Sequence, residues 1–398
     1  MKAQTIAGVG HGAPNRAAAA QGKFEALDSL RGVAAVLVAL FHFLFAGYHH
    51  DLAIVRNGSI GVPMFFVLSG FVVCHAYARR LARPDDLGTF MLRRFGRLYP
   101  LHLFTLGLVF AFEVVKLVLV SAGVKSGQPP FSGANDLPSL AANLALLQAI
   151  IPFDTFTWNG VSWSISTEFY TYMVFGLVLL AAGPAGGIAQ AVLAAASGLL
   201  LLAVETWMPQ LPVTAGRGFL LCLFGFFTGC CVYRAWVSAQ ARGLRTGTLA
   251  ELAATALVAG TYAFHPFGDV GAVMVFALAI FVFAFDGGAV SALLRTRLPR
   301  FLGRISYSIY MMHAVILTFI YGIARAAGSV LKIDLYAPGT ELFSFGPPWV
   351  MDLVALAVLG VIVAASAWTY AHIEAPWRDR FNAWAGNRKL RTPVYERA

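Results

Sequence analysis

Long apolar segments alternate along the chain with short segments rich in Arg, Pro and Gly. A helix needs about 20 apolar residues to cross a bilayer, and the hydropathy pattern predicts ten such helices. The pattern therefore predicts an all-α fold, a polytopic membrane helical bundle of about ten spans. We expect these spans near residues 31–48, 60–78, 98–120, 163–182, 188–207, 217–236, 248–265, 270–286, 304–327 and 349–373.

The composition agrees with this fold class. Hydrophobic residues make up 59% of the 398 residues and charged residues only 12%, whereas a soluble domain carries about 25% charged residues. We expect a flexible cytoplasmic tail over 1–22, one integral-membrane domain over 23–380 and a short cytoplasmic tail over 381–398. All four cysteines lie inside apolar segments, so neither a disulfide framework nor a metal site is expected.

The distribution of charge sets the expected direction of the spans. Most of the 29 Lys and Arg residues fall in the two tails and in the alternate loops on the same side of the bundle. Cytoplasmic loops carry an excess of positive residues, so we expect both termini in the cytoplasm. The net charge of +10 then reflects topology, and no nucleic-acid partner is expected. The lipid bilayer is the predicted partner of this multi-pass chain.

The first predicted span carries two ionisable groups, Arg31 and His42. At 100° and 1.5 Å per residue they face the same direction, about 16 Å apart along the axis. An ionisable residue inside a span is a functional candidate because burying it unpaired is costly. Arg31 has a simpler alternative, a snorkelling side chain paired with Asp28 one turn earlier. For His42 the alternative is a neutral imidazole bonded to a neighbouring helix.

Three arginines lie in the predicted loop over residues 79–97, before the third span. Arg93, Arg94 and Arg97 cluster in the segment FMLRRFGRLYP. The planar guanidinium group makes bidentate bonds to phosphate, so the cluster is a candidate phosphate site. The alternatives are the topology signal itself and contact with anionic lipid headgroups.

The fourth span begins with the segment NGVSWSISTEFYTYMVF, which carries Glu168 about one and a half turns in. A carboxylate at this depth is a candidate partner for an imidazole because it favours the protonated ring; a structural hydrogen bond is the alternative. Ser164 and Ser166 add hydroxyl groups nearby. We interpret His313, at mid-membrane depth, as structural, and Ser69 as a small residue that lets helices approach closely.

Together these segments resemble the acyltransferase-3 family of bacterial integral-membrane O-acyltransferases. The resemblance covers about residues 24–380 and rests on an ordered set of motifs: LDSLRG with ten residues between Arg31 and His42, GVPMFFVLSGF, RRFGRLYP, WSISTEF, LGRISYSIYMMH and IEAPWR. Two positions depart from the family pattern: Ser29 replaces a glycine, and His102 stands where an aromatic residue is usual.

The resemblance implies an enzyme that moves an acyl group, usually acetyl, from cytoplasmic acyl-CoA to a hydroxyl of a saccharide or related acceptor. It implies that His42 is the essential base, that Arg31 is its partner and that Arg93, Arg94 and Arg97 bind coenzyme phosphates. Glu168 matches an acidic position of the family. Acyl-CoA is then a donor substrate, and no permanently bound cofactor is expected.

The sequence leaves two other classes of function open. One is a proton-coupled transporter or flippase of a lipid-linked saccharide, with His42 and Glu168 as a proton relay. The other is a structural membrane subunit of a polysaccharide assembly complex. The sequence shows no inverted repeat of the kind many transporters have, which favours the enzyme.

Overall fold

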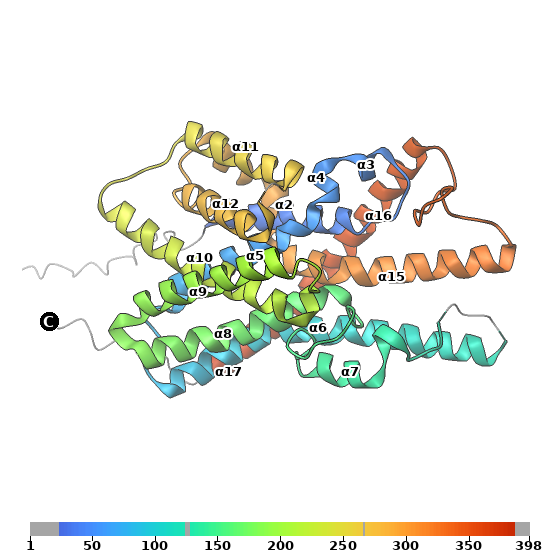
Figure 1. The fold of residues 1–398 in the computed structure, drawn as a ribbon, viewed down its shortest axis with the longest axis horizontal. Helices are drawn as coiled ribbons and strands as arrows, with labels where there is room; N and C mark the ends of the chain where they lie inside the picture. The colour runs from blue at the N-terminus through green and yellow to red at the C-terminus, as the bar shows by residue number, and fades with distance from the viewer. Residues whose placement is uncertain (1–23, 124–127, 266, 387–398) are drawn as a thin grey trace, which may run out of the picture.

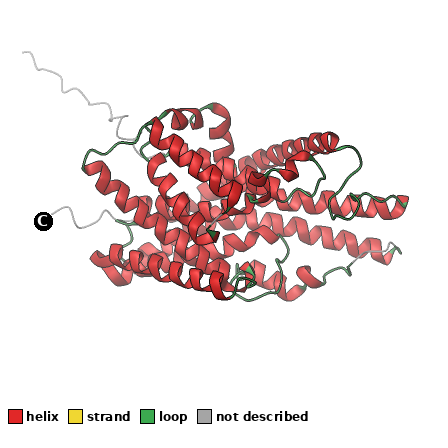
Figure 2. Ribbon diagram, turned by 45° about the horizontal axis from the view of Figure 1, so that its top comes forward, coloured by secondary structure: helices red, strands yellow, loops and turns green. Residues whose placement is uncertain are grey.

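The computed structural model describes residues 24–123, 128–265 and 267–386. Over these residues the fold is helical and contains no β-strand, only two isolated bridges (Figure 2). The long helices α6 (Pro84–Ser121) and α15 (Ser306–Leu331) run along the long axis of the molecule (Figure 1). The expected all-α fold is therefore confirmed over the described part, whereas most of the predicted tails lies outside it.

Seven helical segments are long and apolar enough to cross a membrane. They include α5, α6, α8, α9, α10, α15 and α16, several with short flanking helices. The remaining bounds in this group are α5 (Gly61–Tyr77), α8 (Trp163–Ala182), α9 (Gly186–Trp207), α10 (Gly218–Ala241) and α16 (Pro348–Thr369). Each of the seven coincides with a predicted span.

Three further predicted spans correspond to shorter helices. They are α2 (Glu25–Phe41), α11 (Thr248–Phe264) and α12 (Gly268–Phe283), of 17, 17 and 16 residues. The total of ten membrane crossings therefore stays a prediction. The expected first span, 31–48, differs from α2 at both ends: the helix begins at Glu25 and ends at Phe41. Short helices follow it, namely α3 (Tyr48–Asp51), α4 (Ala53–Arg56) and η1 (Gly58–Ile60).

The expected loop over residues 79–97 is largely helical. The chain turns at residues 78–83, and α6 begins at Pro84 and continues for 38 residues, through Pro100. Proline at the first turn of a helix is favourable because its missing N–H would have no partner there. Arg93, Arg94 and Arg97 therefore lie on a helix, which fixes their spacing and direction more firmly than a loop would.

Connections between the long helices contain short helical pieces. Between α6 and α8 lie η2 (Gly133–Asn135), α7 (Leu137–Leu144) and η3 (Gly160–Ser162), and η4 (Gly183–Ala185) and η5 (Val213–Arg217) flank α9. Before α15 lie α13 (Ala289–Leu294) and α14 (Arg297–Arg304). After α16 the chain continues through η6 (Tyr370–Glu374) into α17 (Ala375–Gly386), so the tail predicted from residue 381 begins within a helix.

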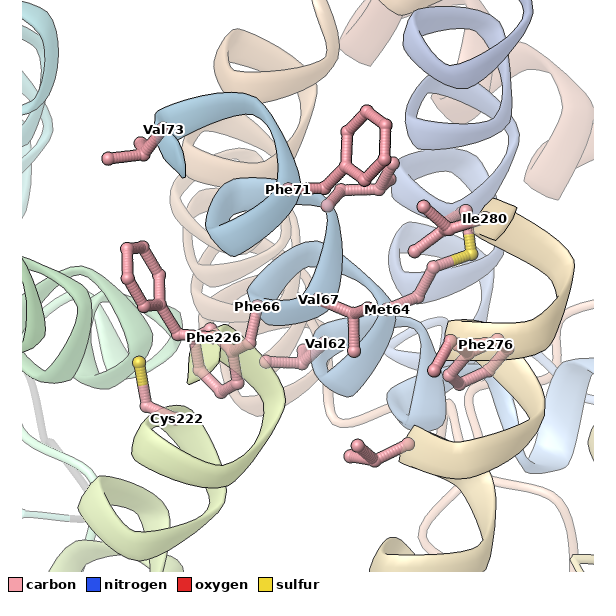
Figure 3. Close-up of a cluster of buried hydrophobic side chains, with 14 of the residues drawn as sticks. Val62, Met64, Phe66, Val67, Phe71, Val73, Cys222, Phe226, Phe276 and Ile280 are labelled. Carbon is pink, nitrogen blue, oxygen red and sulfur yellow. The ribbon is translucent and has the colours of Figure 1, made fainter. Parts of the chain in front are cut away.

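Helix α5 lies at the centre of the core. Its side chains pack against Cys222 and Phe226 of α10 on one side and against Phe276 and Ile280 of α12 on the other (Figure 3). Gly70 allows the closest approach: a Cβ added there would lie 1.8 Å from the carbonyl oxygen of Phe226. Gly70 of the segment LSGF therefore serves helix packing, as the sequence predicts.

Two further close contacts hold the end of the bundle that is rich in arginine, here named the basic end. It is formed by the start of α2, by residues 93–97 of α6, and by α14 and α17. A Cβ on Gly32 of α2 would lie 2.4 Å from the backbone nitrogen of Gly303 in α14, and a Cβ on Gly96 would lie 2.1 Å from Cβ of Phe381 in α17. These contacts place α14 and α17 directly beside α2 and α6.

Candidate active site

A cavity of about 810 Å³ lies at the basic end, between helices α2, α5, α6, α8, α14, α15 and α17. Cations outnumber acids around it. Its cationic residues are Arg31, Arg94, Arg97, Arg297, Arg300, Arg304 and Arg378, and its acidic residues are Glu25, Asp28, Glu168 and Glu374. Such a lining favours an anionic ligand.

Arg31 lies on the wall of this cavity and is held by three groups. Its guanidinium forms an ion pair with Asp28 at 3.0 Å, and its Nε donates to the hydroxyl of Ser306 at 2.8 Å. A longer bond, 3.4 Å, joins Nη2 to the carbonyl oxygen of Gly303. The expected pairing with Asp28 is present, and the same side chain also ties α2 to α14 and α15.

The arginine cluster of α6 is divided by the structure. Arg94 and Arg97 line the cavity, whereas Arg93 is not among the lining residues. The guanidinium of Arg94 lies 5.3 Å from the ring centroid of Tyr77 and 5.7 Å from that of Tyr172. Such cation–π contacts orient the group without neutralising it, so Arg94 keeps its charge available to a ligand.

Glu168 also lines the cavity, but its hydrogen bond differs from the expected one. Its Oε1 accepts from the hydroxyl of Tyr172 at 2.6 Å, and that hydroxyl lies 2.9 Å from Oγ of Ser69. No contact in the described part of the chain joins Glu168 to His42. The carboxylate therefore belongs to the polar wall of the cavity beside Arg94.

The two serines of the fourth-span motif have different surroundings. Ser164 lines the cavity and donates to the hydroxyl of Tyr310 at 2.8 Å. Ser166 instead donates to the carbonyl oxygen of Leu146 at 2.6 Å and accepts from the backbone N–H of Ala149. Ser166 thus fastens the α7–α8 connection to α8, and only Ser164 faces the cavity.

His42 follows the last residue of α2, and its ring lies against His313 of α15, with 5.0 Å between the centroids. In each ring Nδ1 bonds a backbone carbonyl four residues earlier, Val38 at 2.8 Å for His42 and Ile309 at 3.1 Å for His313. A carbonyl oxygen only accepts, so Nδ1 carries the proton in both neutral rings. Nε2 of each neutral ring is therefore unprotonated and can accept a proton.

The second nitrogen of His313 has no hydrogen-bond partner among the described residues, although the side chain is fully buried. A buried polar atom without a hydrogen-bond partner costs free energy of folding, so we expect this nitrogen to have a functional role. The sequence analysis interpreted His313 as structural. In the structure His313 lies beside His42 with the lone pair of Nε2 unused, and the structural interpretation stays a prediction.

Tyr310 connects the cavity to the histidine pair. Its ring lines the cavity with Phe65, at 5.6 Å between centroids, and lies 5.8 Å from the ring of His313. His42 itself is not among the lining residues. The histidine pair therefore lies behind a wall of aromatic side chains, beyond the cavity that the arginines surround.

The backbone of His42 is held from the end of the bundle opposite the basic end. The hydroxyl of Tyr321 accepts from the N–H of Leu44 at 2.6 Å and donates to the carbonyl oxygen of His42 at 3.3 Å. Phe343 stacks on Tyr321, and its backbone bonds Leu44 and Ala46 on either side of an isolated bridge to Phe45. The segment after α2 is thus fixed by the connection between α15 and α16.

Sequence reasoning did not find the cavity residues of α14 and α17. It used Arg304 and Arg378 only as parts of the motifs LGRISYSIYMMH and IEAPWR, and it treated the other arginines there as a topology signal. The spacing of Arg297, Arg300 and Arg304 is three and then four residues, which puts all three on one helical face and would have indicated a common target. Glu374 accepts from Ser308 at 2.8 Å, which joins the motifs IEAPWR and LGRISYSIYMMH at the cavity.

Comparison with known proteins shows the family to which the chain belongs. Residues 24–369 match the acyltransferase-3 family, described as an acyltransferase domain. The chain is 34% identical over 164 residues to Acyltransferase MdmB of Streptomyces mycarofaciens, over 39% of each protein. It is also 34% identical over 163 residues to Protein 2 in picA locus of Rhizobium radiobacter, over 38% of this chain and 81% of the relative.

No solved structure matches this chain. The family match extends from the start of α2 to the end of α16 and so includes Arg31, the arginines of α6, Glu168 and both histidines. The alignment to Acyltransferase MdmB covers less than half of that protein, so the family, and not the single relative, carries the assignment. The chain belongs to the acyltransferase-3 family and contains apolar helices suited to a membrane.

Proposed function

We propose that the protein transfers an acyl group from acyl-CoA to a hydroxyl of a saccharide or related acceptor, and that this acyl group is acetyl. The observation that carries this proposal is the course of the cavity. It begins among seven arginines at the basic end and reaches the aromatic wall in front of His42 and His313. Phosphate groups fit the first part and a base-catalysed acyl transfer fits the second.

The donor binds with its nucleotide at the basic end, where guanidinium groups meet its phosphates. Its pantetheine arm follows α2 from Arg31 toward His42, about 16 Å along an unbroken helix. Arg31 is too far from His42 to act on the same atom. Because it is bonded to Ser306 and Asp28, it positions the helices that line the donor channel. The coenzyme is a substrate and leaves after each turnover.

The base is His42, through Nε2. As the acceptor oxygen attacks the thioester carbonyl, Nε2 takes the hydroxyl proton; the carbon–sulfur bond then breaks, and the proton passes to the departing thiolate. We assign to His313 the role first considered for Glu168: while Nε2 of His42 holds the proton, Nε2 of His313 accepts a hydrogen bond from that N–H, until the proton passes to the thiolate. Glu168, with Tyr172 and Ser69, orients the donor beside Arg94. Ser164 supports Tyr310 in the wall that the acyl group must pass.

We place the basic end in the cytoplasm because positive residues mark cytoplasmic loops. Both termini then lie in the cytoplasm of a bacterial inner-membrane protein, and the acceptor reaches His42 from the outer side. The aromatic wall at Phe65 and Tyr310 keeps water from the thioester until an acceptor is present.

One observation favours a second candidate, a proton-coupled flippase of a lipid-linked saccharide. Two imidazole rings in contact inside an apolar bundle are an arrangement suited to proton relay. Coenzyme A distinguishes the two functions, because a proton-coupled carrier has no reason to bind it.

The test uses purified protein in detergent with radiolabelled acetyl-CoA and compares wild type with His42→Ala and Arg94→Ala. We expect the wild type to release coenzyme A, His42→Ala to bind the donor without turnover, and Arg94→Ala to bind it weakly. Turnover that survives in His42→Ala excludes the mechanism. A wild type that binds no acyl-CoA of any chain length excludes the enzyme in favour of the carrier.

A further inference from the structure

We propose that α14 recognises the phosphomonoester on the ribose of coenzyme A, and so makes the enzyme discriminate against 3′-dephospho donors. This inference rests on the proposed function and assigns a second phosphate site within the same cavity. The residues are Arg297 and Arg304, with Arg300 between them on the same face of the helix.

The order of groups along the donor decides which arginines meet which phosphate. In acyl-CoA the thioester is followed by the pantetheine arm, then the diphosphate, then the ribose with its 3′-phosphate. With the thioester directed toward His42, the diphosphate lies in the deeper part of the cavity and the 3′-phosphate at its mouth. Arg94 and Arg97 are half-buried, whereas Arg297 and Arg304 line the same cavity from exposed positions.

The charges of α14 are available to a ligand. Arg300 forms a long ion pair with Glu25, at 3.4 Å between Nη1 and Oε2. In the described part of the chain, neither Arg297 nor Arg304 has an acidic partner. By contrast, Arg295, two residues before α14, is paired with Asp286 at 2.8 Å. A phosphomonoester carries nearly two negative charges at neutral pH, and two unpaired guanidinium groups match it.

The position of α14 relative to the base is fixed. Gly303 packs directly on α2, where a Cβ on Gly32 would come within 2.4 Å of its backbone nitrogen. Nη2 of Arg31 also donates to the carbonyl oxygen of Gly303. Helix α2 then continues unbroken to Phe41, next to His42. A phosphate bound by α14 therefore lies at a fixed distance from the reacting centre. A site that recognises both ends of the donor at once requires such a fixed distance.

The experiment measures equilibrium binding of coenzyme A and of 3′-dephospho-coenzyme A to the full chain in detergent, so that no acceptor is needed. It compares wild type, the double variant Arg297→Gln/Arg304→Gln and the matched control Arg295→Gln. We expect wild type to bind coenzyme A at least about tenfold more tightly than the dephospho form, since charge-assisted bonds are strong. The double variant reduces this ratio to about threefold or less, and Arg295→Gln keeps it.

Two outcomes overturn the inference while leaving the proposed function intact. One is a wild type that binds both compounds equally; the other is a double variant that keeps the full ratio. If wild type binds neither compound, the proposed function fails, and the inference with it. Should the double variant be unstable in gel filtration, the single variants Arg297→Gln and Arg304→Gln serve instead, each with the ratio reduced by part of the same factor.

Discussion

The imidazole ring of His42, which directly follows α2, lies against the tilted ring of His313 on α15, with 5.0 Å between the two centroids. Both rings donate through Nδ1 to their own helix, so both present an unprotonated Nε2. One ring acting as a base therefore has a second acceptor beside it when it takes up a proton. This relationship, more than any single residue, sets what the site is expected to do.

Replacing His42 by Ala should abolish turnover while preserving donor binding. A positioned general base contributes about 10²–10⁴-fold to the rate, and we expect kcat to fall by that factor. Coenzyme A affinity should change by less than about twofold, because the base lies beyond the cavity. His50→Ala, on α3, is the control and should keep wild-type kcat. Loss of coenzyme binding in His42→Ala would contradict this division.

His313→Leu should lower kcat about a hundredfold, and His313→Gln only about tenfold, because Gln retains a hydrogen-bond acceptor for the imidazolium of His42. The measurements are kcat, KM for the donor and the thermal unfolding midpoint of each variant. A merely structural histidine would give losses that follow the unfolding midpoint, with no advantage for Gln.

Arg94→Gln should raise the KM for acetyl-CoA about tenfold, whereas Arg93→Gln should raise it by less than about threefold. The reason is that Arg94 lines the cavity and Arg93, the adjacent residue, does not; one charge-assisted bond is enough for the larger effect. Steady-state kinetics with varied donor provides the comparison. Equal effects of the two changes would argue for a general surface attraction to the anionic donor.

Tyr321→Phe should lower kcat about tenfold with little change in donor KM. The hydroxyl bonds the backbone on both sides of Phe43, and removing it leaves the N–H of Leu44 without a partner. Tyr336→Phe is a matched control, since the hydroxyl of Tyr336 accepts from Nε of Arg325 on the exposed side of the same region. An equal decrease of kcat in both variants would mean that the whole connection between α15 and α16, and not the hydroxyl of Tyr321 alone, affects the rate.

Gly70→Ala should destabilise the protein by about 1–3 kcal/mol, the usual cost of overpacking a core. The added Cβ would meet the carbonyl oxygen of Phe226, and a backbone atom cannot move aside as a side chain can. Gly107→Ala, where the added Cβ meets nothing within 4 Å, should be neutral or slightly stabilising. Thermal unfolding in detergent distinguishes the two.

The helices could be predicted from the sequence because a lipid-facing helix needs a long run of apolar residues, and hydropathy detects such runs directly. The position of α5 at the centre could not, since its composition resembles that of the peripheral helices. The end of α2 was also missed. Apolar residues continue past Phe41, and only the bonds of Tyr321 and Phe343 to the following segment show why the helix stops there.

The candidate site was only partly predictable for a different reason. Arg31 and His42 share one helix, so the helical repeat determines their relation. Pairs from separate helices, such as His42 with His313, or Glu168 with Tyr172 and Ser69, depend on packing that one sequence does not reveal. The arginines of α14 were hidden because one charge pattern serves both topology and ligand binding.

The contact of Phe343 with Leu44 and Ala46 joins the connection between α15 and α16 to the backbone that carries the base. Variation in that connection among natural proteins would therefore change the reaction rate even where it never touches an acceptor. Comparisons that assign acceptor preference to this connection from its variability alone would confuse selectivity with the tuning of catalytic rate. Exchanging this connection between relatives would therefore change the catalytic rate together with any acceptor preference that the connection carries.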